Sequence, residues 1–179
     1  MASTIGSVLT VVVLAVSASA QVPKGNVFIG YSYLSADTGL GRQSVNGWNA
    51  SLEGKVLPFI GVVGDFSGHY GGSQCTASIP PVCGKIPGTL NTFLFGLRIS
   101  ASAAGVRPFA HAMFGASHER TRGSVVASDT AFATAIGGGL DFRLAPVLGW
   151  RVQGDYLQTR FFNSTQNNVR LSTGLVLRF

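Results

Sequence analysis

The sequence predicts an all-β fold, an eight-stranded antiparallel up-and-down β-barrel that crosses a membrane with its strands. Residues 169–179 alternate apolar residues or Thr with residues that are mostly polar or Gly, as a strand does between hydrocarbon and water. The first 20 residues resemble a secretory leader. The composition is apolar, with 46% hydrophobic and 11% charged residues, yet no stretch after Ala20 has the length of a membrane helix.

Residues 1–20 are predicted to be a cleavable signal peptide. The apolar core runs from Val8 to Val16, and the small residues 18–20 match a signal-peptidase site. The leader has no Lys or Arg before its core, which departs from the usual pattern. A signal anchor is the alternative reading, but the core is shorter than the roughly 20 residues that a membrane helix requires. Residues 21–179 are then one barrel domain, exported to the outer membrane of a Gram-negative bacterium.

Eight segments of this domain alternate with period two and have nearly the roughly 9–11 residues of a tilted membrane-spanning strand. They are residues 26–34, 47–56, 60–70, 89–100, 106–118, 131–143, 150–159 and 169–179. The connections between them alternate between long and short. In outer-membrane barrels the long loops face outward and the short turns face the periplasm. Both termini are therefore expected on the periplasmic side, together with the short turns at 57–59, 101–105 and 144–149.

The same alternation predicts which side chains point into the barrel. In segment 47–56, Trp48 and Leu52 share one parity, whereas Glu53 and Lys55 take the other. Because the outer face of a membrane barrel is apolar, the charged parity faces inward. An eight-stranded barrel is filled by its own side chains, so we expect a plugged polar interior with paired charges. The predicted network comprises Glu53, Lys55, Asp65, His69, Arg98, Asp141, Arg143, Arg151, Asp155, Arg170 and Arg178.

One predicted strand has a weak alternation, and aromatic residues lie near the ends of several strands. The alternation is weakest in segment 106–118, where it allows His111 to face lipid. Aromatic residues near the predicted strand ends suit the girdles that outer-membrane barrels carry at both membrane interfaces. These aromatic residues are Tyr31, Tyr33, Trp48, Tyr70, Trp150, Tyr156 and Phe179.

Cys75 and Cys83 lie close together in a segment rich in Gly, Pro and Ser. In an exported chain the compartment is oxidising, which favours a small loop disulfide between them. Their spacing is too long for a CxxC ligand pair and no second pair exists, so a metal site is disfavoured. We expect no cofactor.

The whole domain resembles the OmpA-like superfamily of eight-stranded outer-membrane β-barrels, in particular its small porin-family members. The resemblance rests on segments 47–52, 64–70 and 137–141 and on the terminal Phe179. It implies that barrel-assembly machinery and periplasmic chaperones are partners during biogenesis. The assembly signal would consist of Leu175, Leu177 and Phe179. No residues follow the eighth segment, so a peptidoglycan-binding domain is not expected.

Enzymatic chemistry is a weaker reading. Some small outer-membrane barrels modify lipid A, which requires a nucleophile or base at the lipid-facing rim. The best candidates, Asp65, Ser67 and His69, share the inward parity, which favours a buried structural histidine. We therefore predict a non-enzymatic protein, with a lipid-A-modifying enzyme as an outside alternative.

The net charge of +6 does not indicate nucleic-acid binding, because the basic residues are divided between the interior and the loops. The outer-loop cations are Arg42, Lys85, Arg120, Arg122 and Arg160. They are suited to the phosphates of lipopolysaccharide or another anionic surface polymer. Ordinary solvated loop charge is an equally good reading.

Three function classes remain. The first is a monomeric structural or surface-interaction protein that displays its loops from a barrel embedded in outer-membrane lipid. The second is a narrow or gated pore for small solutes, which needs a water path through the interior. The third, a soluble lipocalin-like carrier, requires apolar side chains inside and polar ones outside, opposite to the parity seen here.

Overall fold

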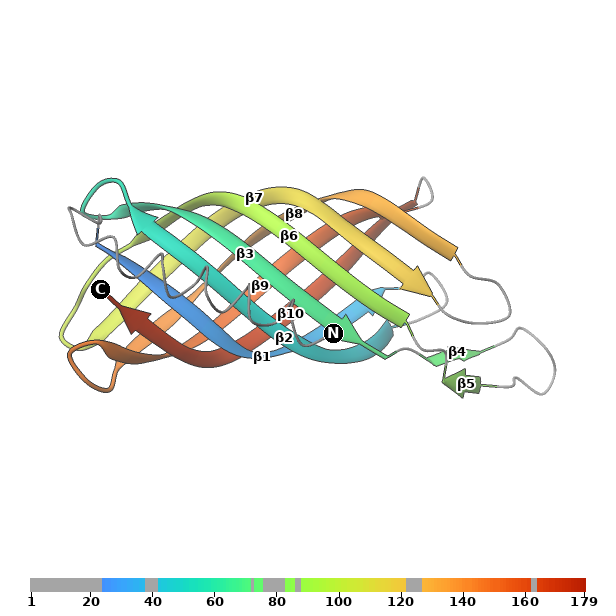
Figure 1. Ribbon diagram of the computed structural model, residues 1–179, viewed down its shortest axis with the longest axis horizontal. Helices are drawn as coiled ribbons and strands as arrows, with labels where there is room; N and C mark the ends of the chain where they lie inside the picture. The colour runs from blue at the N-terminus through green and yellow to red at the C-terminus, as the bar shows by residue number, and fades with distance from the viewer. Residues whose placement is uncertain are drawn as a thin grey trace, which may run out of the picture.

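The computed structural model describes residues 24–37, 42–71, 73–75, 83–85, 88–121, 127–161 and 164–179. They form a closed barrel of eight antiparallel strands, seen from the side in Figure 1. Neighbouring strands along the chain pair with one another, and the last strand closes onto the first. The predicted fold class is confirmed. The barrel strands are β1 (Gly25–Asp37), β2 (Arg42–Lys55), β3 (Ile60–Tyr70), β6 (Gly88–Ser100), β7 (Val106–Thr121), β8 (Ala127–Arg143), β9 (Leu148–Phe161) and β10 (Ser164–Arg178).

The barrel closes where β10 pairs with β1. The register places Asn26 opposite Arg178 and Ser35 opposite Val169. The bonding continues past the strand end, because Gly25 N donates to Phe179 O at 3.0 Å and Phe179 N donates to Gly25 O at 3.1 Å. Closure leaves no barrel strand with an unpaired edge, which is the condition for a sheet to stand in hydrocarbon. No helix in the described part of the chain is long and apolar enough to cross a membrane.

Each predicted strand coincides with an observed one, but several observed strands are longer at the end that carries the long loops. β2 begins at Arg42, β8 at Ala127 and β10 at Ser164, each four or five residues before the predicted start. The apolar-polar alternation marks only the part of a strand whose outer face is apolar. Backbone pairing continues beyond it into polar sequence, where the alternation disappears.

A small hairpin was not predicted. β4 (Ser73–Cys75) and β5 (Cys83–Lys85) form a separate two-stranded sheet, at the end of the barrel opposite the C-terminus (Figure 1). The register places Cys75 opposite Cys83. Opposed Cα atoms in an antiparallel pair lie about 4.5–5.5 Å apart, within the range that a disulfide spans. The two side chains lie outside the described residues, so the disulfide stays a prediction.

The outer face of the barrel is apolar. Phe95, Ile99, Phe114 and Ile136 are each more than half exposed, and the ring of Phe66 packs edge-on against Phe93 and Phe95 at centroid distances of 5.6 and 6.1 Å. Aromatic residues hydrogen-bond along this face. Trp150 Nε1 donates to Thr173 Oγ1 at 2.6 Å and Trp48 Nε1 donates to the Tyr70 hydroxyl at 3.2 Å. Trp150 and Tyr70 lie near strand ends, whereas Trp48 lies in the middle of β2, so the girdles stay a prediction.

Candidate functional site

Arg170 lies at the centre of the barrel interior and is fully buried. Its Nη1 donates to Asp65 Oδ1 at 2.7 Å and to Ser67 Oγ at 3.0 Å, and its Nε donates to Asp155 Oδ2 at 2.8 Å. One guanidinium thus bridges two carboxylates that come from opposite parts of the sequence. The adjacent Gly137 makes room for this arrangement, because a Cβ there would lie 2.2 Å from Asp155 Oδ1.

His111 connects this group to the next cation. Its Nε2 lies 2.7 Å from Asp155 Oδ1 and its Nδ1 lies 3.3 Å from Arg98 Nη2. A guanidinium has donors only, so Nδ1 must accept and Nε2 must carry the hydrogen that Asp155 accepts. The side chain is buried. The orientation toward lipid that the sequence allowed for His111 is therefore wrong, because the inward parity of β7 continues through it, with Phe109 and Met113 also buried.

Glu53 continues the network toward the chain termini. It accepts from Arg98 Nη1 at 3.1 Å and from Asn26 Nδ2 at 2.9 Å, and it pairs with Lys55 Nζ at 3.2 Å. The Asn26 amide oxygen in turn accepts from Arg151 Nη2 at 3.1 Å. Asn26 therefore joins the Glu53 group to a second ion pair.

That second pair is Arg151 with Asp141. Arg151 donates from Nε at 2.7 Å and from Nη2 at 3.0 Å, a bidentate geometry that is among the stronger ionic contacts. The ring of Phe109 lies between two guanidinium groups, with its centroid 4.5 Å from Arg98 Cζ and 4.7 Å from Arg151 Cζ. Both guanidinium groups thus make a cation-π contact with the same ring.

An apolar cluster fills the interior next to this network. Leu157 follows Asp155 by two residues on β9, and Leu94 precedes Arg98 by four residues on β6. Both therefore lie closer to the long-loop end than the charge that shares their strand. The buried members of the cluster are Leu34, Val45, Val63, Leu94, Met113, Ala133, Ala135 and Leu157.

Sequence analysis did not identify this apolar cluster. The signal was present, because Leu94, Met113 and Leu157 have the same parity as the inward charges on their strands. Treating the inward face as wholly polar concealed them. The interior thus combines ion pairs with an apolar cluster, and the two overlap along the barrel axis, because Leu34 lies opposite Arg170 and Leu94 lies opposite Asp65 in the strand registers.

The structure places most of the predicted interior residues as expected. Lys55 and Arg178 lie at the mouth near the termini, with side chains 10% and 20% exposed. Arg143 departs from the prediction, because it is exposed. It has the inward parity but is the last residue of β8, beyond the point at which the wall encloses it. The buried predicted residues are Glu53, Asp65, His69, Arg98, Asp141, Arg151, Asp155 and Arg170.

The geometry does not assemble a catalytic triad from Asp65, Ser67 and His69. His69 Nε2 lies 2.9 Å from Ser32 Oγ, whereas Asp65 and Ser67 both accept from Arg170. Among the residues that the structure describes, no group of three or more His, Cys, Asp or Glu side chains is placed to hold a metal ion.

The C-terminal residues face outward. Leu175, Leu177 and Phe179 are 52–55% exposed, on the parity opposite to the buried Arg170 and Val176. Of the predicted outer-loop cations, Arg120 and Arg160 are exposed. Arg122 and the side chains of Arg42 and Lys85 lie outside the described residues.

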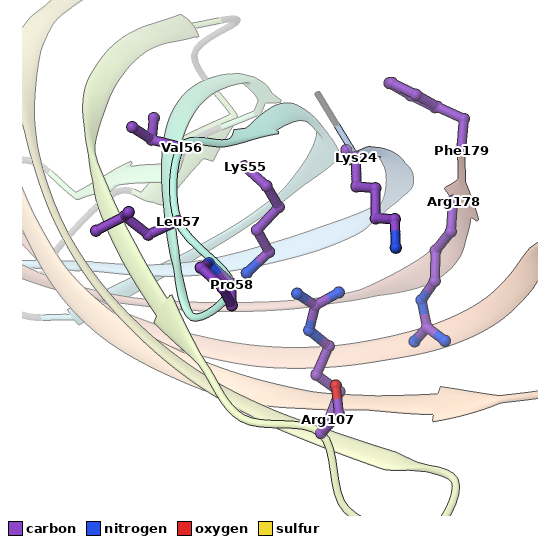
Figure 2. A pocket seen from close by; sticks show the side chains of 10 residues that line it. Lys24, Lys55, Val56, Leu57, Pro58, Arg107, Arg178 and Phe179 are labelled. Carbon is purple, nitrogen blue, oxygen red and sulfur yellow. The ribbon is translucent and has the colours of Figure 1, made fainter. Parts of the chain in front are cut away.

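A pocket of about 570 Å³ occupies the mouth near the termini. Figure 2 shows the amino groups of Lys24 and Lys55 and the guanidinium of Arg107 directed toward a common space, with Arg178 beside it and the Phe179 ring pointing away. The pocket is lined by Lys24, Gly25, Lys55, Val56, Leu57, Pro58, Ser102, Arg107, Arg178 and Phe179.

Several solved structures share this fold. Neisserial surface protein A matches with a TM-score of 0.71 and 12% identity, covering 87% of this chain and 97% of that one. Ail, the attachment invasion locus protein of Yersinia pestis, in complex with the heparin analogue sucrose octasulfate, matches with a TM-score of 0.61 and 15% identity over 89% and 100%. The outer membrane protein OprG of Pseudomonas aeruginosa matches with a TM-score of 0.61 and 10% identity over 89% and 97%. At these identities the likeness shows the fold alone.

No curated protein matches the sequence significantly. The model of one protein family, described as the outer membrane protein beta-barrel domain, matches residues 6–179. This match extends over every strand of the barrel, from β1 to β10. The chain therefore belongs to the outer membrane protein beta-barrel domain family.

Proposed function

We propose that the protein is a non-enzymatic, monomeric barrel that anchors surface-exposed loops in the outer membrane and does not conduct solutes. The filled interior is the observation that carries this proposal. Arg98, Arg151 and Arg170 are completely buried, and each is hydrogen-bonded to a strand that is not its neighbour in the sheet, namely to Glu53 on β2, Asn26 on β1 and Asp65 on β3. A barrel of eight strands has little space beyond its own side chains, and these side chains are tied to one another within it.

The apolar cluster supports the same conclusion. The buried side chains of Leu34, Leu94 and Leu157 occupy lumen space beside the ion pairs. A water path through the barrel would need that space. The ion pairs and the apolar cluster thus fill the lumen together.

The surface role is assigned to the long loops, since loops on a rigid scaffold commonly carry binding functions. Arg120 and Arg160 are exposed near the loop ends of β7 and β9. With the other loop cations they would contact the phosphates of lipopolysaccharide. Ail, which shares the fold, has been solved with a heparin analogue, so this type of barrel is compatible with the recognition of a polyanion.

Biogenesis is proposed to follow the sequence signals. Residues 1–20 would be removed on export to the outer membrane of a Gram-negative cell, and periplasmic chaperones would deliver the chain to the barrel-assembly machinery. The exposed terminal residues Leu175, Leu177 and Phe179 are accessible for recognition by that machinery. A disulfide between Cys75 and Cys83 would constrain the loop that extends from β3 to β6.

Liposome swelling tests the anchor against the porin alternative. Proteoliposomes containing the purified barrel are diluted into isosmotic glycine, arabinose or sucrose, with an open general porin as the positive control. We expect swelling no faster than that of empty liposomes. Size-dependent swelling in glycine and arabinose would contradict the proposal and favour the narrow pore.

The lipopolysaccharide contact has its own test. Arg42, Lys85, Arg120, Arg122 and Arg160 are all changed to Gln, and the lipopolysaccharide that copurifies with the barrel is measured. A clear reduction is expected. The matched control changes Lys24 and Arg107 at the other mouth and is expected to retain lipopolysaccharide. Equal retention by both variants would overturn the proposed contact without affecting the anchor.

A further inference from the structure

The mouth near the termini carries an excess of positive charge. Lys24, Lys55, Arg107 and Arg178 all line one pocket. The neighbouring acids are already occupied. Glu53 is held by the buried Arg98 as well as by Lys55, and Asp141 is held in bidentate fashion by the buried Arg151. The terminal carboxylate of Phe179 balances at most one of the four cations.

Arg178 adds a second, independent observation. Its Nε and Nη2 are buried and make no hydrogen bond within the described residues. The nearest acid oxygen, Asp141 Oδ2, lies 3.7 Å from Nη2, which is an electrostatic contact beyond hydrogen-bond range. Buried donors without partners are costly, and these donors belong to a residue that lines an open pocket.

We propose that this mouth, formed by Lys24, Lys55, Arg107 and Arg178, binds a phosphate-bearing ligand. Guanidinium groups match phosphate oxygens in paired geometry, and ammonium groups add point charges from any direction. Four cationic groups around one space suit the several oxygens of a phosphate better than the two of a carboxylate. The pocket volume of about 570 Å³ also accommodates the glycerol or sugar that an ester carries.

Two sources can supply this chemistry at a periplasmic mouth. One is the headgroup of an anionic phospholipid in the adjacent leaflet, and the other is a soluble phosphate ester. The surroundings suit both, because Figure 2 shows Val56 and Leu57 directed away from the cations while the pocket itself is open. The inference does not depend on the loop function, because the hairpin of β4 and β5 lies at the opposite end of the barrel from the C-terminus (Figure 1).

The rate at which each lysine amine is acylated reports whether the mouth is occupied. The chain has three, and Lys24 and Lys55 line the pocket, whereas Lys85 belongs to β5 at the opposite end. The protein in phosphatidylcholine nanodiscs is acylated at its amines and the rate at each lysine is followed by mass spectrometry. One arm adds glycerol 3-phosphate against potassium chloride of equal ionic strength. The other arm replaces part of the lipid with phosphatidylglycerol, which also surrounds the opposite end of the barrel.

We expect slower acylation of Lys24 and Lys55 than in the chloride control, and a smaller change at Lys85, whose loop is proposed to contact the phosphates of lipopolysaccharide by a separate surface. A probe at ten times its dissociation constant leaves about one mouth in eleven free, so the rate falls about tenfold. Protection in the lipid arm alone identifies a headgroup, protection in the soluble arm alone identifies a phosphate ester, and both together identify phosphate itself. If neither probe slows the two lysines relative to Lys85, the proposal is overturned.

Variants test whether the named cations form the site. Arg178→Gln is expected to abolish most of the protection at Lys24 and Lys55. Arg107→Gln provides a second variant in case Arg178→Gln does not assemble. Arg120→Gln removes the same charge from an exposed position at the other end and should leave protection intact. Full protection in the assembled Arg107→Gln or Arg178→Gln barrel would contradict the proposal.

Discussion

The interior packing has two halves, one polar and one apolar, which overlap along the barrel axis because Leu34 lies opposite Arg170. In the polar half, Arg98, Arg151 and Arg170 bind carboxylates from several strands, whereas in the apolar half Leu34, Leu94 and Leu157 pack as hydrocarbon. Both halves are built on the same inward parity. The comparison teaches that parity determines which side chains enter the lumen, while the chemistry of each inward position varies.

The two halves should respond differently to mutation. A buried ion pair is expensive to form, and removing one partner leaves an uncompensated charge. An apolar contact is non-directional and scales with area, and the cost of its loss depends on the cavity that remains. The polar half therefore depends on each partner being present, and the apolar half depends on volume.

The largest effect is expected from Arg170→Met, which keeps much of the side-chain volume but leaves Asp65 and Asp155 without their cation. We expect a loss of about 3–5 kcal/mol in unfolding free energy, measured by urea titration in lipid vesicles. Adding Asp65→Asn and Asp155→Asn to Arg170→Met should recover much of this loss. A triple variant as unstable as the single one would show that charge pairing is not the cause.

In the apolar half, Leu157→Ala is expected to cost about 2–4 kcal/mol, because it opens a cavity within the cluster. The control is Leu171→Ala, whose side chain is 54% exposed on the outer face. Lipid can occupy the space vacated there, so the loss should be smaller in the same titration. Equal losses at both positions would mean that Leu157 does not pack in a closed interior.

Asn26 links the two ion-pair groups, and its loss should lower the unfolding free energy less than the loss of a charge from either group. Asn26→Ala removes one hydrogen bond from Glu53 and one from Arg151, while both charges keep their ionic partners. The expected loss is about 1–2 kcal/mol. A loss as large as that of Arg170→Met would show that Asn26 is essential to the whole network.

The smallest effect concerns the long-loop mouth, where Glu119 pairs across β7 and β8 with Asp129. Burial, followed by the charge of Asp129, raises the pKa of Glu119 above its ordinary value. The folded state therefore holds this proton more tightly than the unfolded state, and stability falls as pH rises from the unfolded pKa through the folded one. Glu119→Gln should remove that slope and stabilise the barrel at neutral pH by a few tenths of a kcal/mol. An unchanged slope between acid and neutral pH would contradict this assignment.

Much of this architecture follows from the sequence because the side-chain period of a strand is two. That period alone predicted the burial of Asp65, Asp155 and Arg170. It did not predict that Arg170 binds Asp65, 105 residues away, because contacts across the lumen depend on the tilt and stagger of the closed sheet. The sequence of a single strand does not determine that stagger.

The remaining differences have local causes. Arg143 kept the inward parity but lies at the strand end, where the wall no longer encloses a side chain. His111 was ambiguous because Pro108 and Phe114 on the same strand disturb the alternation. The apolar cluster was missed because Leu and Met on the inward parity were not distinguished from lipid-facing residues. The four cations of the terminal mouth come together from β2, β7, β10 and the residue before β1.

Single-channel recording in planar bilayers tests the central claim most directly, namely that ion pairs and hydrocarbon together close the lumen. The folded barrel, verified by its heat-modifiable migration, is inserted from detergent and recorded at both polarities. The account predicts no discrete conductance steps. Reproducible steps in the wild-type protein would show that water and ions pass through the filled interior, and the barrel would then have to be described as a pore.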